Sequence, residues 1–323
     1  MPYKKKLILL GSTAALLALI YILTIVFDPV RTNARNERFT WLPSASREEA
    51  DRIEIIRGGE KLELFLKGGA WYALLGAFEI PVKQGRIDDL MRLLSTRGAF
   101  PRRGSTSASH AELGLDGSCR LIIRGGAGIP LLDLLVGKED PSGRGIFLRM
   151  NGENEFRSGD RLIGSYVLGE TSSWLDMKLF EDKSVSLVQR VEVHYFDYYG
   201  MGEEISSDPY MDYTITRSGE EWILNGINPN KDRAENWMRA ILDVQGENIL
   251  AVTNEINDEL INIFYPAARI TIELGDGSVL ELQIEKPDEE GKSLALAGGK
   301  PYFFIFSQWT NMRLLRDRDF FIN

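Results

Sequence analysis

The chain has 323 residues, and 38 basic against 47 acidic side chains give it a net charge of −9 at pH 7. This acidic balance argues against nucleic acid as a partner, because nucleic-acid binding needs a basic surface. The length predicts two domains. Cys119 is the only cysteine, so an intrachain disulfide is excluded.

The first feature in chain order is an uncharged apolar run that extends from Leu7 to Phe27, directly after three lysines. About 20 apolar residues in a helix are enough to span the hydrocarbon core of a bilayer. A cleavable signal peptide would have a shorter apolar segment and a small-residue cleavage site. We therefore predict an uncleaved N-terminal membrane anchor over residues 1–27, which contacts membrane lipid through residues 7–27.

The charges on either side of this run indicate its orientation. Lys4, Lys5 and Lys6 predict a cytoplasmic N-terminus, because basic residues flanking a membrane helix stay inside. Arg31, Arg35 and Arg38 lie just past the run and reduce the asymmetry. The prediction is a single-pass membrane protein in which an extended linker over 28–50 leads to an exported soluble part, and the single cysteine is compatible with a bacterial periplasm.

Residues 51–183 have the pattern of one α+β module. Short segments of alternating polarity, separated by glycine pairs, predict an antiparallel meander over 52–55, 62–66 and 71–74. Four apolar residues with the spacing of one helix face then predict a helix: Ile87, Leu90, Met91 and Leu94. Further strands are expected over 120–124 and 131–136 and near Phe147 and Phe156, before a helix at about 159–168 and a closing segment at 174–180.

Residues 184–323 repeat this order. Residues 190–193 (Arg-Val-Glu-Val) restate residues 52–55 (Arg-Ile-Glu-Ile), and the helix face recurs at a constant offset of 147 residues as Ala234, Trp237, Met238 and Ile241. Tight turns favour antiparallel pairing, since parallel strands need long crossovers. We predict an α+β fold of two tandem duplicated modules, each a mostly antiparallel sheet with one main helix, after an N-terminal transmembrane helix.

The second module differs from the first in an enlarged hairpin between Tyr195 and Tyr210. Aromatic side chains are typical of interface anchors, although packing between the modules is an alternative use for them. The hairpin is therefore the candidate contact patch, and its aromatic members are Tyr195, Phe196, Tyr198, Tyr199 and Tyr210.

These landmarks resemble a bacterial family known as domain of unknown function 4340. Its members look like this chain from end to end, with an anchor, an Arg-Ile-Glu-Ile strand, a tryptophan-containing strand, a helix, and closing segments like residues 174–180 and 315–320. One departure is Met177 in the first closing segment, where the second has Arg318. The resemblance implies an accessory role beside ABC transporter components of the type linked to gliding motility, and it supplies no catalytic residue.

The residues that most often carry chemistry are few and isolated in this sequence. A zinc site needs three or four ligands, and neither His110 nor His194 has a second ligand at a suitable spacing. A catalytic cysteine needs a histidine partner, and none is evident for Cys119, which begins a predicted strand and is expected to be a buried structural thiol. We predict no catalytic residue, no metal site and no cofactor.

Two further motifs have structural interpretations. The glycine-rich run at 125–128 lacks the Gly-Lys-Ser/Thr ending of a phosphate-binding loop and is expected to be a hairpin turn. Asp133 falls on the outward face of an alternating strand, and Asp176 is expected to form an ion pair with Lys178.

Together with this resemblance, the sequence leads us to expect a non-catalytic accessory or scaffold protein of an ABC-type transport complex, anchored in the bacterial inner membrane with its soluble part in the periplasm. The alternative is an envelope ligand-binding module that holds a glycan or a lipid headgroup in the cleft between the two modules. A hydrolase ranks third.

The predicted topology can be tested with reporter fusions placed after residue 50. A reporter that is active only after export is expected to be active there, because the anchor directs the following chain across the membrane. An inactive exported reporter, together with an active cytoplasmic reporter at the same site, would reverse the predicted orientation.

Overall fold

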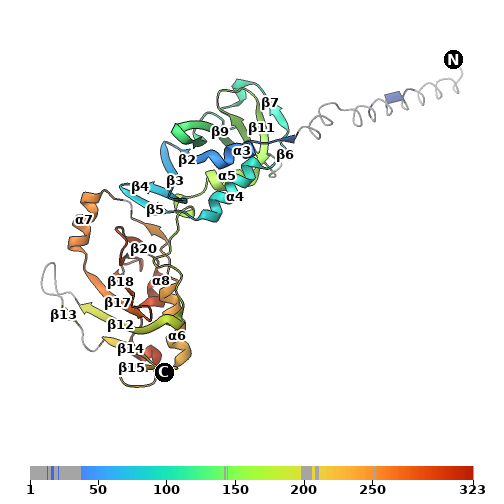
Figure 1. Cartoon of the computed structure of the whole chain (residues 1–323). Helices are drawn as coiled ribbons and strands as arrows, with labels where there is room; N and C mark the ends of the chain where they lie inside the picture. The colour runs from blue at the N-terminus through green and yellow to red at the C-terminus, as the bar shows by residue number, and fades with distance from the viewer. Residues whose placement is uncertain are drawn as a thin grey trace, which may run out of the picture. The chain divides into compact units, whose positions relative to one another are not determined.

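The computed structural model describes residues 13, 16, 17, 21, 38–141, 143, 145–197, 206, 207, 211–250 and 252–322 (Figure 1). All but four residues of the predicted membrane segment 7–27 lie outside this part of the chain. Among the described residues, no helix is both long enough and apolar enough to cross a membrane.

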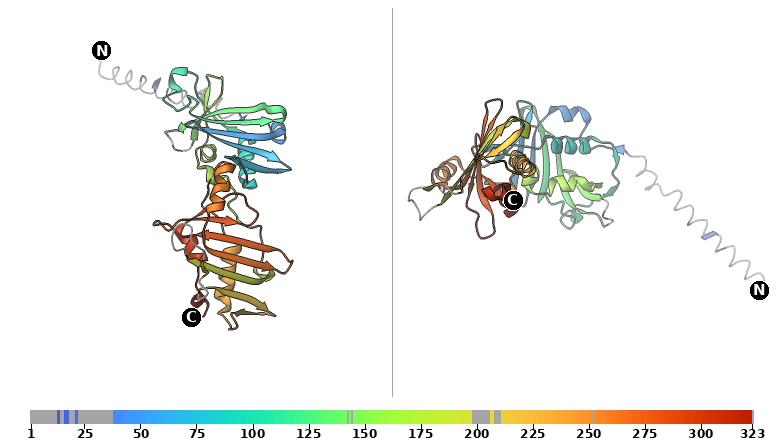
Figure 2. Two further views of the ribbon diagram at one scale, coloured as in Figure 1. Left: turned by 90° about the vertical axis from the view of Figure 1, so that its left-hand side faces the viewer. Right: turned by 90° about the horizontal axis from the view of Figure 1, so that it is seen from below.

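The strands form two large antiparallel sheets, so the predicted α+β class is confirmed (Figures 1 and 2). The first sheet has the order β5-β4-β3-β2-β8-β9-β10-β11-β7. Its strands are β2 (Ala50–Arg57), β3 (Glu60–Lys67), β4 (Ala70–Leu75), β5 (Phe78–Pro81), β7 (Arg102–Gly104), β8 (Cys119–Gly125), β9 (Ile129–Glu139), β10 (Gly145–Met150) and β11 (Phe156–Asp160). A separate small sheet pairs β1 (Arg38–Phe39) with β6 (Gly98–Ala99).

The second large sheet has the order β15-β14-β12-β17-β18-β19-β20-β16, and β13 pairs with β12 beside this path. Its strands are β12 (Val188–Asp197), β13 (Ser206–Ser207), β14 (Tyr213–Ser218), β15 (Glu221–Leu224), β16 (Asn248–Ile249), β17 (Pro266–Leu274), β18 (Val279–Glu285), β19 (Ser293–Ala297) and β20 (Phe304–Phe306).

Six α-helices lie in the described part of the chain: α3 (Ser44–Glu49), α4 (Gln84–Ser95), α5 (Arg161–Val167), α6 (Lys231–Leu242), α7 (Asn254–Ile263) and α8 (Gln308–Leu314). Short 3-10 helices add η1 (Ser107–Ser109), η2 (Gly126–Gly128), η3 (Thr171–Ser173), η4 (Val185–Leu187) and η5 (Arg318–Phe321). Side-chain caps set several helix starts. Asp160 accepts the backbone N–H of Leu162 at α5, and Ser307 accepts that of Thr310 at α8.

The chain divides into two compact units. The first contains residues up to Trp71 and Gln84–Gly169, and the second contains Tyr72–Lys83 and Glu170–Asn323. The closing segment 174–180 therefore belongs to the second unit, where Lys83 donates its backbone N–H to the carbonyl of Trp174.

The two large sheets have the same order of corresponding strands. With β5 and β13 set aside, β4-β3-β2-β8-β9-β10-β11-β7 matches β15-β14-β12-β17-β18-β19-β20-β16 position by position. Helices α4 and α6 follow β5 and β15 in chain order, and α5 and α8 follow β11 and β20. The correspondence includes edge strands β7 and β16, which the sequence did not predict.

Both predicted helix faces are buried, as the apolar spacing indicated. In α4 the buried residues are Ile87, Leu90, Met91 and Leu94. In α6 they are Ala234, Trp237, Met238, Ile241 and Leu242. The indole N–H of Trp237 also donates to the carbonyl of Leu314 at 2.9 Å, so this residue joins the main helix to the end of α8.

Alternation along the central strands separates a buried face from a charged face. In β2, Ile53 and Ile55 are buried, while Glu54 points to the opposite face with Arg124 and Lys61, 3.1 and 3.5 Å from its Oε1. Burial raises the pKa of Glu54, but the hydrogen bond from Arg124 and the charge of Lys61 outweigh it and leave the pKa below its usual value. The Arg-Ile-Glu-Ile motif is thus a strand with one apolar and one ionic face.

The segment before β8 differs from its counterpart before β17. Glu112 and Leu113 lie in a turn after η1, whereas Glu259 and Leu260, at the same sequence offset, lie in helix α7. Sequence alternation predicted neither α7 nor α8. Helix α7 buries little of its surface: Asn257 is buried and donates to the carbonyl of Pro301, whereas Ile256 is 49% exposed.

Replacing Trp237 with alanine is expected to lower the free energy of unfolding by about 3–5 kcal/mol, because the change empties a buried site and removes a hydrogen bond. Asn236→Ala, at the exposed neighbouring position, should change it by no more than about 0.5 kcal/mol. Urea unfolding of the detergent-solubilised full-length protein measures both. Equal effects of the two substitutions would contradict the packing described for α6.

Candidate functional site

The two histidines lie in different environments. His110 is buried, its Nε2 lies 3.0 Å from the carbonyl oxygen of Asn154, and its ring meets Phe156 edge to face. His194 lies in β12, where its Nδ1 is 2.9 Å from a carboxylate oxygen of Asp212. Sequence analysis did not identify Asp212 as the partner of His194, because Asp212 is 18 residues away, beyond the enlarged hairpin.

Asp212 also holds the backbone of the same strand. Its second carboxylate oxygen accepts the N–H of Tyr195 at 2.9 Å. The His194–Asp212 pair therefore fastens the base of the hairpin to β12. Two side chains do not make a metal site, and no group of three or more possible ligands occurs in the described part of the chain.

Cys119 is the first residue of β8 and is buried, as expected. Burial raises the pKa of the thiol to about 11, and the nearby charge of Arg57 offsets only part of this effect. Because the thiolate is the reactive form, we expect the thiol of Cys119 to have low nucleophilic reactivity in the folded protein.

The carboxylates singled out in the sequence have structural partners. Asp133 accepts hydrogen bonds from Arg120 at 2.6 Å and from Asn151 at 2.9 Å. The bond from Arg120 is the main reason that the pKa of Asp133 lies below its usual value. The partners lie on the neighbouring strand β8 and just beyond β10, so this cluster ties three parts of the first sheet together.

The predicted ion pair between Asp176 and Lys178 is wrong. Asp176 instead accepts the backbone N–H of Lys178 at 3.2 Å, and the ammonium group of Lys178 lies 2.5 Å from Asp182. An aspartate side chain readily folds back onto the main chain two residues later, and the ammonium group of Lys178 is directed to Asp182, four residues further on. Asp317, in the second closing segment, likewise accepts the backbone N–H of Phe320.

The candidate contact patch is only partly described. Tyr198, Tyr199 and Tyr210 lie outside the described residues. Tyr195 is half-buried and donates its hydroxyl to the carbonyl of Arg316 at 2.8 Å, within the second unit. Phe196 is half-buried too, and the guanidinium of Arg269 lies 5.5 Å from its ring centre.

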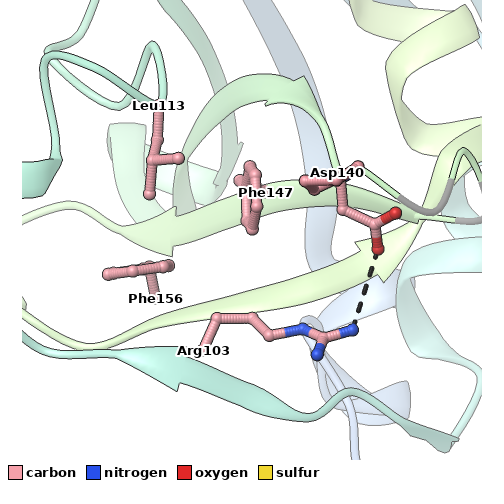
Figure 3. A pocket seen from close by; sticks show the side chains of 6 residues that line it. Arg103, Leu113, Asp140, Phe147 and Phe156 are labelled. Carbon is pink, nitrogen blue, oxygen red and sulfur yellow. Dashed lines mark ion pairs between the residues drawn. The ribbon is translucent and has the colours of Figure 1, made fainter.

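A surface pocket in the first unit brings together residues that the sequence did not single out as a site. It has a volume of about 490 Å³ and is lined by Arg103, Leu113, Asp140, Pro141, Phe147 and Phe156 (Figure 3). The apolar members belong to β10, β11 and the turn after η1, and they continue a buried cluster with Leu115 and Leu135. Such a volume lies within the range of small-molecule sites.

The polar end of the pocket is formed by Arg103 of β7 and Asp140, which follows β9. Figure 3 shows the side chain of Arg103 reaching toward Asp140, and the closest nitrogen and oxygen are 3.8 Å apart. Asp140 is buried and accepts the hydroxyl of Ser158 at 2.7 Å. A second, more polar hollow of about 630 Å³ adjoins it and shares Arg103 and Asp140.

Around this polar end, the backbone at two glycines lies close to neighbouring side chains. A Cβ atom on Gly145 would lie 2.4 Å from the Ser158 hydroxyl and 2.7 Å from Asp140, and one on Gly104 would lie 2.7 Å from the ring of Phe156. Only glycine fits at either place without displacing these side chains. The sequence shows two glycines in strands here, but strand spacing gives no indication that they lie beside one pocket.

The glycine-rich run at 125–128 is a turn between β8 and β9, as predicted, and contains the 3-10 helix η2.

In comparisons with known proteins, no protein family, no curated sequence and no solved structure matches the chain. The interpretation of the pocket therefore depends on its own chemistry.

Cys119 is expected to resist alkylation in the folded protein at mildly alkaline pH, because burial blocks access and the raised pKa keeps the group as a thiol. Labelling with iodoacetamide, followed by intact mass, should be slow for the native chain and complete in urea. Glutathione under the same conditions is the control for reagent quality. Rapid and complete labelling of the native chain would contradict the burial of Cys119.

Proposed function

We propose that this protein is a non-catalytic, membrane-anchored accessory or scaffold subunit of an ABC-type transport complex, with its soluble part in the periplasm. The observation that carries the proposal is the uncharged run from Leu7 to Phe27 after three lysines, ahead of two α+β units. A chain of this kind tethers folded domains at a membrane surface.

The partners of the chemically capable side chains support a non-catalytic role. His194 is paired with Asp212 at the base of a hairpin, and Asp133 is paired with Arg120 across neighbouring strands. Cys119 is buried, with a raised pKa. Each group already contributes to the fold. The His194–Asp212 pair has the form of a base with its orienting group, but no nucleophilic side chain is recorded at Nε2 of His194 among the described residues, as covalent catalysis would need.

We further propose that the two large sheets come from duplicated modules. The matched strand orders support this idea, as does the constant offset between the buried faces of α4 and α6. Tandem modules are well suited to a scaffold, because the second can diverge at its loops while the sheet is retained. The enlarged hairpin of the second unit is such a divergence.

The proposed contact with the transporter is the aromatic hairpin, for which Phe196 is the described probe. Its ring is half-buried and lies over Arg269. Tyr195 is a less suitable probe, because its hydroxyl is bonded to the carbonyl of Arg316 and its replacement would disturb the fold. An aromatic ring beside an arginine is a common composition for an interface centre.

The test is affinity purification of the tagged full-length chain from membranes in mild detergent. The expected result is co-elution, in fixed stoichiometry, with the membrane-embedded and ATP-hydrolysing subunits of an ABC transporter, identified by mass spectrometry. Phe196→Ser should abolish this co-elution while changing the unfolding free energy by less than about 1 kcal/mol, the scale of a cation–π contact.

Val279→Ser is the matched control, because Val279 is 59% exposed and lies in the same unit. This variant should retain both the transporter subunits and its stability. A chain that leaves the membrane without detergent, or that elutes alone from solubilised membranes, would contradict the proposal. Equal loss of the subunits in the two variants would contradict the role of the hairpin.

A further inference from the structure

The pocket in the first unit contains a solvent-accessible guanidinium group, that of Arg103, for which no hydrogen bond to another described residue is recorded. Arg103 is 46% exposed, and its one recorded partner among the described residues is Asp140, 3.8 Å away. That distance is too long for a hydrogen bond. The adjacent Arg102, in contrast, is paired with Glu155 at 3.2 Å.

The hydrogen-bond donors of Arg103 and the apolar wall border the same space. Leu113, Phe147 and Phe156 line the pocket beside this guanidinium (Figure 3). A guanidinium offers parallel N–H donors that fit the two oxygens of a carboxylate. The pocket therefore combines a site for one planar anion with a site for an apolar group.

The charges around Arg103 limit which charged groups a ligand could carry at this end of the pocket. Asp140 lies 3.8 Å away and is held by Ser158, and Asp160 borders the adjoining hollow. These carboxylates disfavour a doubly charged phosphate, because like charges nearby raise its energy. A ligand ammonium would be repelled by Arg103, and the attraction of Asp140 for it is reduced because Asp140 already faces Arg103 and accepts the hydroxyl of Ser158. A ligand with a single carboxylate would bind the guanidinium of Arg103 and would be repelled less by Asp140 and Asp160 than a doubly charged phosphate.

We propose that this pocket binds a small organic acid, with its carboxylate on Arg103 and an aryl or alkyl body against Leu113, Phe147 and Phe156. Asp140, which also lines the pocket and is held by Ser158, is a positioning residue that acts on the guanidinium through its charge, 3.8 Å away. Gly145 and Gly104 allow this arrangement, since a Cβ at either position would displace Ser158 and Asp140 or the Phe156 ring. The proposal does not depend on the transporter role.

The test uses the full-length protein in mild detergent and 4-phenylbutyrate as the probe, with binding measured by calorimetry. Saturable binding is expected. Arg103→Met should weaken it about tenfold or more, the scale of a charge-assisted hydrogen bond. Arg102→Met is the matched control and should leave the affinity unchanged. Circular dichroism and urea unfolding verify that both variants are folded.

Ligand analogues test the chemistry separately from the variants. 4-Phenylbutanol and 4-phenylbutylamine should each bind about tenfold or more weakly than the acid, and phenyl phosphate should not compete with it. Absence of saturable binding by the acid would overturn the proposal. So would equal binding of the amine or alcohol, equal loss in the two arginine variants, or tighter binding of a peptide that ends in phenylalanine with a free carboxylate.

Discussion

The arrangement of each unit depends on the burial of one face of an antiparallel sheet. Because side chains alternate along a strand, burial of Ile53 and Ile55 forces Arg52 and Glu54 onto the opposite face. The opposite face is largely covered here as well, since Glu54 and its neighbour Ile122 on β8 are both buried. A buried charge needs a partner, and Glu54 is paired across the strands with Arg124. The same alternation places Val191 in the second core and Glu192 opposite it.

The elements with strong periodicity were predictable from the sequence, and those fixed by long-range packing were not. The buried residues of α4 matched the expected set, because a helix that covers a sheet must present one apolar stripe. Among the residues of α7 whose burial is described, Asn257 is the one that is buried, and its side chain donates to the carbonyl of Pro301. Strands β7 and β16 are too short for alternation to be detected, although both occupy corresponding edges of the large sheets.

The candidate pocket was not predictable, for a related reason. Its polar members come from β7, from the residue after β9 and from β11, and only the sheet order brings them together. Asp140 stands next to a turn and Ser158 within a strand, positions that carry no signal of a shared site. Cys119 was easier to interpret, since a lone thiol at the start of an apolar strand is usually buried.

The position of β2 has a mechanical consequence. It is the first strand of its sheet in chain order, yet it lies in the interior, hydrogen-bonded to β3 on one side and to β8 on the other. A pull transmitted through the preceding residues would first load the β1–β6 pair and the backbone bonds of Trp41 and Leu42 to Leu94. Once these yield, a force along β2 would strain both of its ladders in shear, so many backbone bonds would have to break together rather than one after another. A tether that enters at an edge strand would unzip its sheet bond by bond under a smaller force.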